Sequence, residues 1–252
     1  MVPMLVFGSV FFLIGLLVFF GVRHSKERVA GIQNLGLELK LRYFPDGHVT
    51  LDPVLNNLDF FKHGQRRVSN LLLGRILIDN ELMSIAIFDY QVTMNKTINR
   101  AYVNNSSIDG ACVDQSASFI QTVVMFHDSA LHLPSFHLRP EFPLDRVATL
   151  AGTDDVDFDD HPEFSKRYCL IGPDHAAIRS IFKPALIEHF ESDLICSQGK
   201  GSYVMLWPFP ASMNFIQTAY IEGVTRLNSK LLNADEIRAY LKFGASLVRM
   251  LR

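Results

Sequence analysis

The sequence predicts an α+β fold: an antiparallel sheet with C-terminal helices packed on one face, preceded by one transmembrane helix. The chain opens on an uncharged apolar run, its middle part favours strands, and its end has the three- and four-residue apolar spacing of amphipathic helices. We therefore expect three parts: a transmembrane helix at residues 4–22, a juxtamembrane helix at 23–35, and one soluble α+β domain at 36–252.

The apolar run at residues 4–22 is long enough to cross a bilayer. It contains no charged side chain, and 14 of its residues are Leu, Ile, Val or Phe. A helix of that length reaches about 28 Å, the thickness of a hydrocarbon core. A cleaved signal peptide fits less well, because no Lys or Arg precedes the run and no small-x-small cleavage site follows it.

The charges that follow this run predict its orientation. Arg23, Lys26 and Arg28 lie directly after it, in the juxtamembrane helix that we expect to end at Gly36. The side of a membrane helix that is richer in Lys and Arg stays in the cytoplasm. The sequence therefore predicts a single-pass membrane protein with a cytoplasmic C-terminal domain.

Period-two alternation predicts the strands of this domain. It occurs at residues 37–43, and two apolar runs at 71–78 and 82–90 flank a turn at 79–81, which is typical of a β-hairpin. Other runs, rich in β-branched and aromatic residues, predict strands at 118–127, 133–138 and 203–207.

Helical spacing dominates after these strands. A helix is predicted at 174–192, and Pro184 should kink or split it. Two more helices are predicted at 213–232 and 234–252, the second with Asn233 as its N-cap. Strands first and helices last is the pattern of α+β proteins.

Composition excludes several classes of protein. The net charge of −2 argues against a nucleic-acid binder, which usually has a basic excess. Cys112, Cys169 and Cys196 are too few and too widely spaced for a disulfide framework or a zinc site, and we expect no cofactor. No HExxH, GxSxG, P-loop or dinucleotide-binding motif occurs, so a role without catalysis is favoured.

An acidic segment from Asp154 to Glu163 is the strongest candidate for a metal site. Its candidate ligands are Asp155, Asp157, Asp159 and His161. Oxygen ligands suit Ca²⁺ or Mg²⁺, and the alternating aspartates begin like an EF-hand loop. The pattern then departs from that loop, because Asp160 stands where the loop requires Gly. A metal site and a solvated acidic turn both remain open.

A basic cluster is formed by Lys62, Arg66 and Arg67, beside two phenylalanines. Close to an inner leaflet, such residues would contact anionic lipid headgroups, each contributing about 1 kcal/mol. A charged turn at a sheet edge is the alternative.

Several short strings occur in the domain in a fixed order. They are Gly64-x-x-Arg67-x-x-Asn70, Phe88-Asp89-Tyr90, Gln121-Thr122-Val123, Leu133-Pro134-x-Phe136-x-Leu138-Arg139-Pro140-Glu141, the run from Asp157 to Tyr168 that contains His161-Pro162-Glu163-Phe164-Ser165, and Phe182-x-Pro184-Ala185-Leu186. Together they resemble an uncharacterised family of bacterial membrane-anchored proteins. The resemblance covers about residues 35–207. It implies a shared fold and a membrane tether, no known activity, and a structural turn at the His-Pro-Glu-Phe run.

Asp89, Arg67 and Arg139 are charged residues within otherwise apolar stretches of these strings. A charge held among strands is costly unless it is paired. We therefore expect an ion pair between Asp89 and one of the two arginines. This ion pair would either stabilise the sheet or line a pocket.

These features favour a membrane-tethered cytoplasmic module that binds a partner or acts as a scaffold. Its expected partners are the membrane, through the single N-terminal span, and a protein, but not nucleic acid. Two alternatives stay open: a metal-dependent hydrolase that uses the acidic segment, and a structural subunit of a larger membrane complex.

Overall fold

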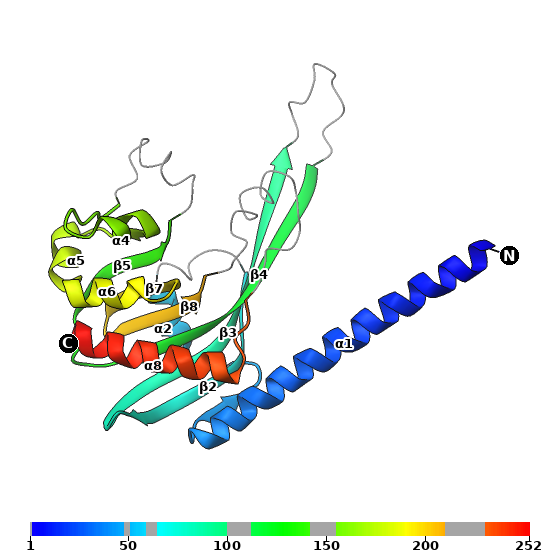
Figure 1. The fold of residues 1–252 in the computed structure, drawn as a ribbon, viewed down its shortest axis with the longest axis horizontal. Coiled ribbons are helices and arrows are strands. Elements are labelled where there is room, and N and C mark those ends of the chain that lie inside the picture. The colour runs from blue at the N-terminus through cyan, green and yellow to red at the C-terminus, as the bar shows by residue number, and fades with distance from the viewer. Residues whose placement is uncertain (1, 48–50, 59–64, 100–111, 142–154, 210–229) are drawn as a thin grey trace, which may run out of the picture.

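The computed structural model describes the chain except residues 1, 48–50, 59–64, 100–111, 142–154 and 210–229 (Figure 1). Within these residues one eight-stranded sheet forms the centre of the domain, in the order β1-β2-β3-β4-β8-β7-β5-β6. All of its strand pairings are antiparallel. The strands are β1 (Arg42–Phe44), β2 (Gln65–Ile78), β3 (Glu81–Asn99), β4 (Cys112–His127), β5 (Leu133–Pro140), β6 (Tyr168–Ile171), β7 (Ile195–Gly201) and β8 (Tyr203–Pro208). The predicted α+β class is confirmed.

Helices cover both faces of this sheet. They are α1 (Val2–Glu38), α2 (Asp52–Asn57), α4 (Pro162–Arg167), α5 (His175–Ile181), α6 (Pro184–Glu191) and α8 (Ala234–Leu251). The end of α1 and helices α4, α5, α6 and α8 pack on one face, which we call the first face, through a core that includes Ile32, Phe164, Phe190 and Leu247. On the opposite second face, α2 packs through Leu55, together with its flanking residues Leu51 and Leu58. The sequence predicted helices on one face and did not predict α2.

The predicted membrane span and juxtamembrane helix belong to one continuous helix, α1, of 37 residues. Figure 1 shows α1 extending away from the domain, with only its C-terminal end against the sheet. Among the residues whose side chains the structure describes, no helix is long and apolar enough to cross a membrane. The span predicted at 4–22 lies outside that set except at residues 19, 20 and 22, so it remains a prediction.

The strand predicted at 37–43 is wrong in its first half, because α1 continues past Gly36. The helix stops in a Schellman motif: the Leu41 N–H donates to the Gly36 carbonyl at 2.8 Å, and the Lys40 N–H donates to the Leu37 carbonyl at 3.2 Å. Lys40 has the left-handed φ of 55° that this motif requires. Only the last part of the predicted strand forms β1.

Gly36 is needed for close packing and not as the helix cap. A Cβ atom at this position would lie 2.5 Å from Leu72 Cδ2 on β2. The glycine therefore lets the end of α1 approach the sheet closely.

The predicted hairpin is confirmed as β2 and β3. Asp79 and Asn80 have φ values of 47° and 66°, as a two-residue type I′ turn requires. The helix predicted at 174–192 is split at Pro184 into α5 and α6, as expected.

The last helix also begins where the sequence indicated. The Asn233 side chain accepts from two backbone N–H groups of the first turn of α8, and Glu236 completes a capping box. The helix predicted at 213–232 lies outside the described residues except at its end. There the prediction is wrong, because Lys230 forms an isolated bridge with Gln121 and residues 231–232 are not helical. Strands β6 and β7 were not predicted, because β6 has four residues and β7 contains two glycines.

Candidate functional site

A buried ion pair joins the N-terminal helix to the centre of the sheet. Arg28 on α1 donates from Nη1 to Asp89 Oδ2 at 2.8 Å and from Nη2 to Asp89 Oδ1 at 2.7 Å. The side chains of Arg28 and Asp89 are only 9% and 2% exposed. Two parallel N–H···O bonds fix both the distance and the orientation of the partners. The pair therefore sets the angle at which α1 leaves the domain.

Two neighbouring strands supply the remaining hydrogen bonds of the Asp89 carboxylate. Asn70 on β2 donates to Oδ2 at 2.8 Å, and the Thr122 hydroxyl on β4 donates to Oδ1 at 2.9 Å. Asn70 has a left-handed φ of 50° at a register shift between Ser69 and Leu72, which turns its side chain towards the first face. With Arg28, the carboxylate accepts four hydrogen bonds.

The same network fixes the segment that leads into α8. Arg28 Nε donates to the Leu232 carbonyl at 2.9 Å, and the Leu232 N–H donates to Thr122 Oγ1 at 2.9 Å. Tyr43 on β1 extends the network by donating to Asn70 Oδ1 at 2.7 Å. We call Arg28, Asn70, Asp89 and Thr122 the ionic lock. It joins segments that are far apart in the chain.

Neither arginine that the sequence offered to Asp89 is its partner. Arg67 lies at the surface with Asp46 at 3.5 Å, and Arg139 lies on β5, three places along the sheet from β4. The sequence did contain a signal for Arg28. Its spacing from Ile32 and Leu35 places it on the apolar side of α1, where an unpaired charge would be costly.

The start of the acidic segment is held against β6. The Asp155 carboxylate accepts the Leu170 N–H at 2.6 Å, and the Asp155 backbone forms an isolated antiparallel bridge with Ile171 at the edge of β6. Burial raises the pKa of Asp155 from its ordinary value. The Asp157 carbonyl accepts from Arg179 at 3.2 Å.

The rest of that segment begins α4. His161 stands at the N-cap without a side-chain capping bond, and the Ser165 hydroxyl accepts the Phe158 N–H at 2.9 Å. Asp154 lies outside the described residues. Among those described, no three His, Cys, Asp or Glu side chains come close enough to hold a metal ion. Asp155, Asp157, Asp159 and His161 are thus not gathered at one point, and the hydrolase alternative gains no support.

The basic cluster is only partly described, because Lys62 lies outside the described residues. Arg66 donates to Oδ1 of Asn56 on α2 at 2.7 Å. Arg66 and Arg67 are adjacent on β2, so their side chains leave opposite faces of the strand. Their contact with lipid remains a prediction.

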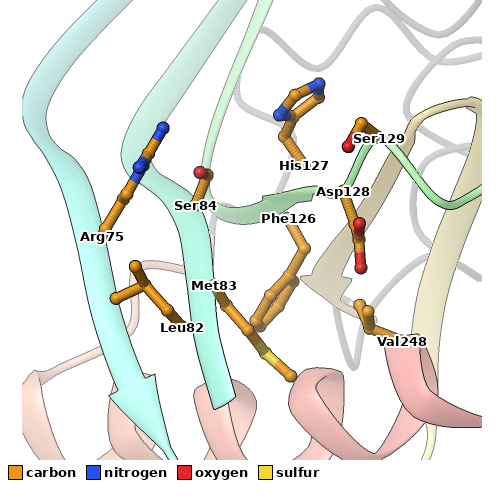
Figure 2. Close-up of a pocket in the computed structure, with 9 residues that line it drawn as sticks. All are labelled: Arg75, Leu82, Met83, Ser84, Phe126, His127, Asp128, Ser129 and Val248. Atoms are coloured by element: carbon orange, nitrogen blue, oxygen red, sulfur yellow. The ribbon is translucent and has the colours of Figure 1, made fainter.

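A polar row crosses the second face near the end of the β2–β3 hairpin. Arg75 on β2 pairs with Ser84 on β3, Ser84 pairs with His127 on β4, and His127 pairs with Tyr203 on β8. Figure 2 shows Arg75, Ser84 and His127 on one side of the strands, whereas Met83 and Phe126 point to the other side, towards α8. We call Arg75, Ser84, His127 and Tyr203 the polar row. Sequence reasoning missed it, because alternation does not reveal which residues lie opposite each other on paired strands.

The polar row borders a groove of about 300 Å³ between the sheet and α2. Its floor is apolar and consists of Leu73, Ala86 and Met125, which are cross-strand neighbours in the next row of the sheet. Leu51, at the N-cap of α2, and Val54 on that helix form its wall. The volume is at the lower end of the range of small-ligand sites, roughly 300–1,000 Å³.

His137, also on the second face, gives a pH-dependent prediction. Burial lowers its pKa to about 4, and the charge of Arg139 adds to the effect. The unfolded chain, with an ordinary pKa of about 6.5, then binds a proton between pH 6.5 and 4 that the folded chain does not. Lowering the pH from 7.5 to 5 should therefore reduce the free energy of unfolding by about 2 kcal/mol through this residue.

Urea titrations at the two pH values measure this loss in the wild type and in His137→Gln, with Trp207 fluorescence as the signal. The variant should lose about 2 kcal/mol less than the wild type. An equal loss in both proteins would show that another group is responsible.

Comparisons with known proteins add little. No protein-family model matches the sequence, and no curated protein does. The crystal structure of the mycobacterial trehalose monomycolate transport factor A, TtfA, is similar with 12% sequence identity and a TM-score of 0.43, over 89% of this chain and 96% of that one. At this TM-score the similarity carries no argument about function.

Proposed function

We propose that the chain is a membrane-tethered binding or scaffold module. In this proposal residues 4–22 cross the bilayer once, and the α+β domain lies on the cytoplasmic side at a fixed orientation. The observation that carries it is the continuity of α1, which runs from the uncharged apolar segment into a helix end held by the ionic lock.

The geometry of α1 supports a domain close to the bilayer surface. A helix rises about 1.5 Å per residue, so Arg28 follows the end of the span by only about 9 Å. A flexible linker would let the domain diffuse around its anchor, but a continuous helix with a buried bidentate ion pair resists bending. Every molecule would thus hold its domain in the same orientation to the membrane and present the same surface to its partners.

The charges beside the span support the cytoplasmic side. Arg23 and Lys26 are exposed on α1, and Arg23 makes only an exposed i,i+4 ion pair with Glu27. They remain available to the anionic inner leaflet, whereas Arg28 is used by the ionic lock.

Alkaline carbonate extraction of membranes tests the tether. The 14 large apolar residues of the span contribute about 4–8 kcal/mol to insertion, and two arginines near its centre cost about 5–7 kcal/mol. The wild type should stay in the membrane pellet after the wash. The double variant Leu13→Arg, Leu17→Arg should be released, whereas the matched control Leu13→Ile, Leu17→Ile should behave as the wild type.

Release of the wild type by carbonate would contradict the tether. Sidedness is read separately by protease treatment of inside-out vesicles. We expect complete digestion of the α+β domain there, and protection of the domain would contradict its cytoplasmic side.

A further inference from the structure

The polar row contains a cation that has no partner among the described residues. Within the described part of the chain, Arg75 has neither an ion pair nor a hydrogen bond, and its side chain is exposed at the border of the groove. Among the described residues, the carboxylates of Asp79, Glu81 and Asp128 are engaged elsewhere. They are bound by Arg249 of α8 and by Arg252, which follows that helix. An anion in the groove would therefore meet Arg75 without competition.

Hydroxyl and imidazole groups beside Arg75 can complete an anion site. Ser84 is its cross-strand partner, and the His127 and Tyr203 rings lie next in the row with centroids 4.7 Å apart. A carboxylate or phosphate has enough acceptor positions for a guanidinium and a neighbouring hydroxyl at once.

The floor of the groove favours a hydrocarbon chain over a peptide. The floor residues Leu73, Ala86 and Met125 each pair with residues on both neighbouring strands, so their backbone N–H and C=O groups are used within the sheet. A peptide that docks on a sheet normally takes its affinity from the free backbone groups of an edge strand. An alkyl chain needs only apolar contact, which the half-buried Leu73 and Val54 provide above the buried Ala86 and Met125.

Apolar surface also continues on the other side of the polar row. Leu77 and Leu82 form a cross-strand pair at the hairpin end and are 67% and 60% exposed. The row of polar groups thus lies between two apolar areas on the same face of the sheet.

We infer that this groove binds an amphiphile with one anionic group and a single apolar chain. Arg75 and Ser84 hold the carboxylate or phosphate, and the chain lies on the apolar floor beside Val54 of α2. This site is independent of the membrane tether, because every residue in it belongs to the α+β domain.

Photolabelling of the full-length protein in phosphatidylcholine vesicles tests the inference. The probe is a dodecanoic acid that carries a diazirine in its chain, and the corresponding dodecanol is the neutral control. Labelled peptides are mapped by mass spectrometry. We expect the acid to label α2 and the floor strands about tenfold more than the alcohol does, since a hydrogen bond to a charged group is worth about one order of magnitude in affinity or more.

Three variants sharpen the result. Arg75→Gln should reduce groove labelling by the acid about tenfold. Val54→Trp should abolish it, because the indole fills the groove from a half-exposed position on its wall. Lys183→Gln removes an exposed charge far from the groove and should leave labelling unchanged. Each variant must unfold at the wild-type temperature for its labelling to count.

Any of the following outcomes would overturn the inference. They are equal labelling by acid and alcohol, unchanged labelling in Arg75→Gln, labelling confined to residues 4–22, and displacement of the probe by inorganic phosphate as readily as by dodecanoate. The last would indicate a site for a free anion. Displacement by a short peptide with a free C-terminus at lower concentration than dodecanoate would assign the groove to a protein tail.

Discussion

Replacing Asp89 with Ala is expected to lower the free energy of unfolding by about 3–5 kcal/mol. The substitution leaves Arg28 buried without a counter-charge and removes the acceptor of Asn70 and Thr122. Buried donors without partners lose their hydration and gain nothing in return. Urea unfolding in mild detergent, followed by the fluorescence of Trp207, measures the loss.

A double-mutant cycle separates the interaction energy of the Arg28–Asp89 pair from the effect of each single substitution. Arg28→Met and Asp89→Leu should each cost about as much as Asp89→Ala. The double variant Arg28→Met, Asp89→Leu should recover at least half of the summed loss, because no buried charge is then left alone. Arg67→Met is the matched control, because Arg67 is exposed and its ion pair with Asp46, at 3.5 Å, lies at the surface. This substitution should change the free energy of unfolding by less than about 0.5 kcal/mol. Additive losses from the two single substitutions would contradict a direct ion pair.

Replacing Phe164 with Ala is expected to cost about 3–5 kcal/mol of unfolding free energy. Phe164 is 1% exposed and lies in an aromatic cluster with Tyr168, Phe158 and Phe182, at ring-centroid distances of 5.2, 5.8 and 6.3 Å. These rings join α4 to the strand and helix that follow, and the cavity cannot close without moving them. The same urea titration measures the effect.

Lys166→Ala on the same helix is the control. Its side chain is 61% exposed and pairs only with Glu163, so it should cost less than about 1 kcal/mol. A comparable loss in both variants would mean that α4 responds to any substitution, which would contradict a specific role for the aromatic cluster.

Short-range sequence signals were sufficient to predict the turns, breaks and helix starts that depend on them. The turn at Asp79 and Asn80, the break at Pro184 and the cap at Asn233 each depend on a few neighbouring residues. The end of α1 was misjudged because Gly36, a usual helix cap, serves close packing, while Lys40 adopts the left-handed conformation.

Long-range partners could not be predicted in the same way. Arg28 and Asp89 are 61 residues apart, and the polar row requires the register of four strands. The sequence indicated that Asp89 needs a cation but not which one. Asn70, Asp89 and Thr122 each occur in one of the short strings noted in the sequence, and all three belong to the ionic lock. Their role in this structure is to hold α1.

The central claim is that the ionic lock holds α1 at one angle to the domain. The most direct test is the distance distribution between spin labels at His24→Cys and Lys183→Cys, measured by pulsed electron resonance in nanodiscs on a Cys112→Ser background. We predict one narrow distribution in the wild-type lock and a broad one when Asp89 is replaced with Asn. A broad distribution with the lock intact, or a narrow one that Asp89→Asn leaves unchanged, would contradict the account.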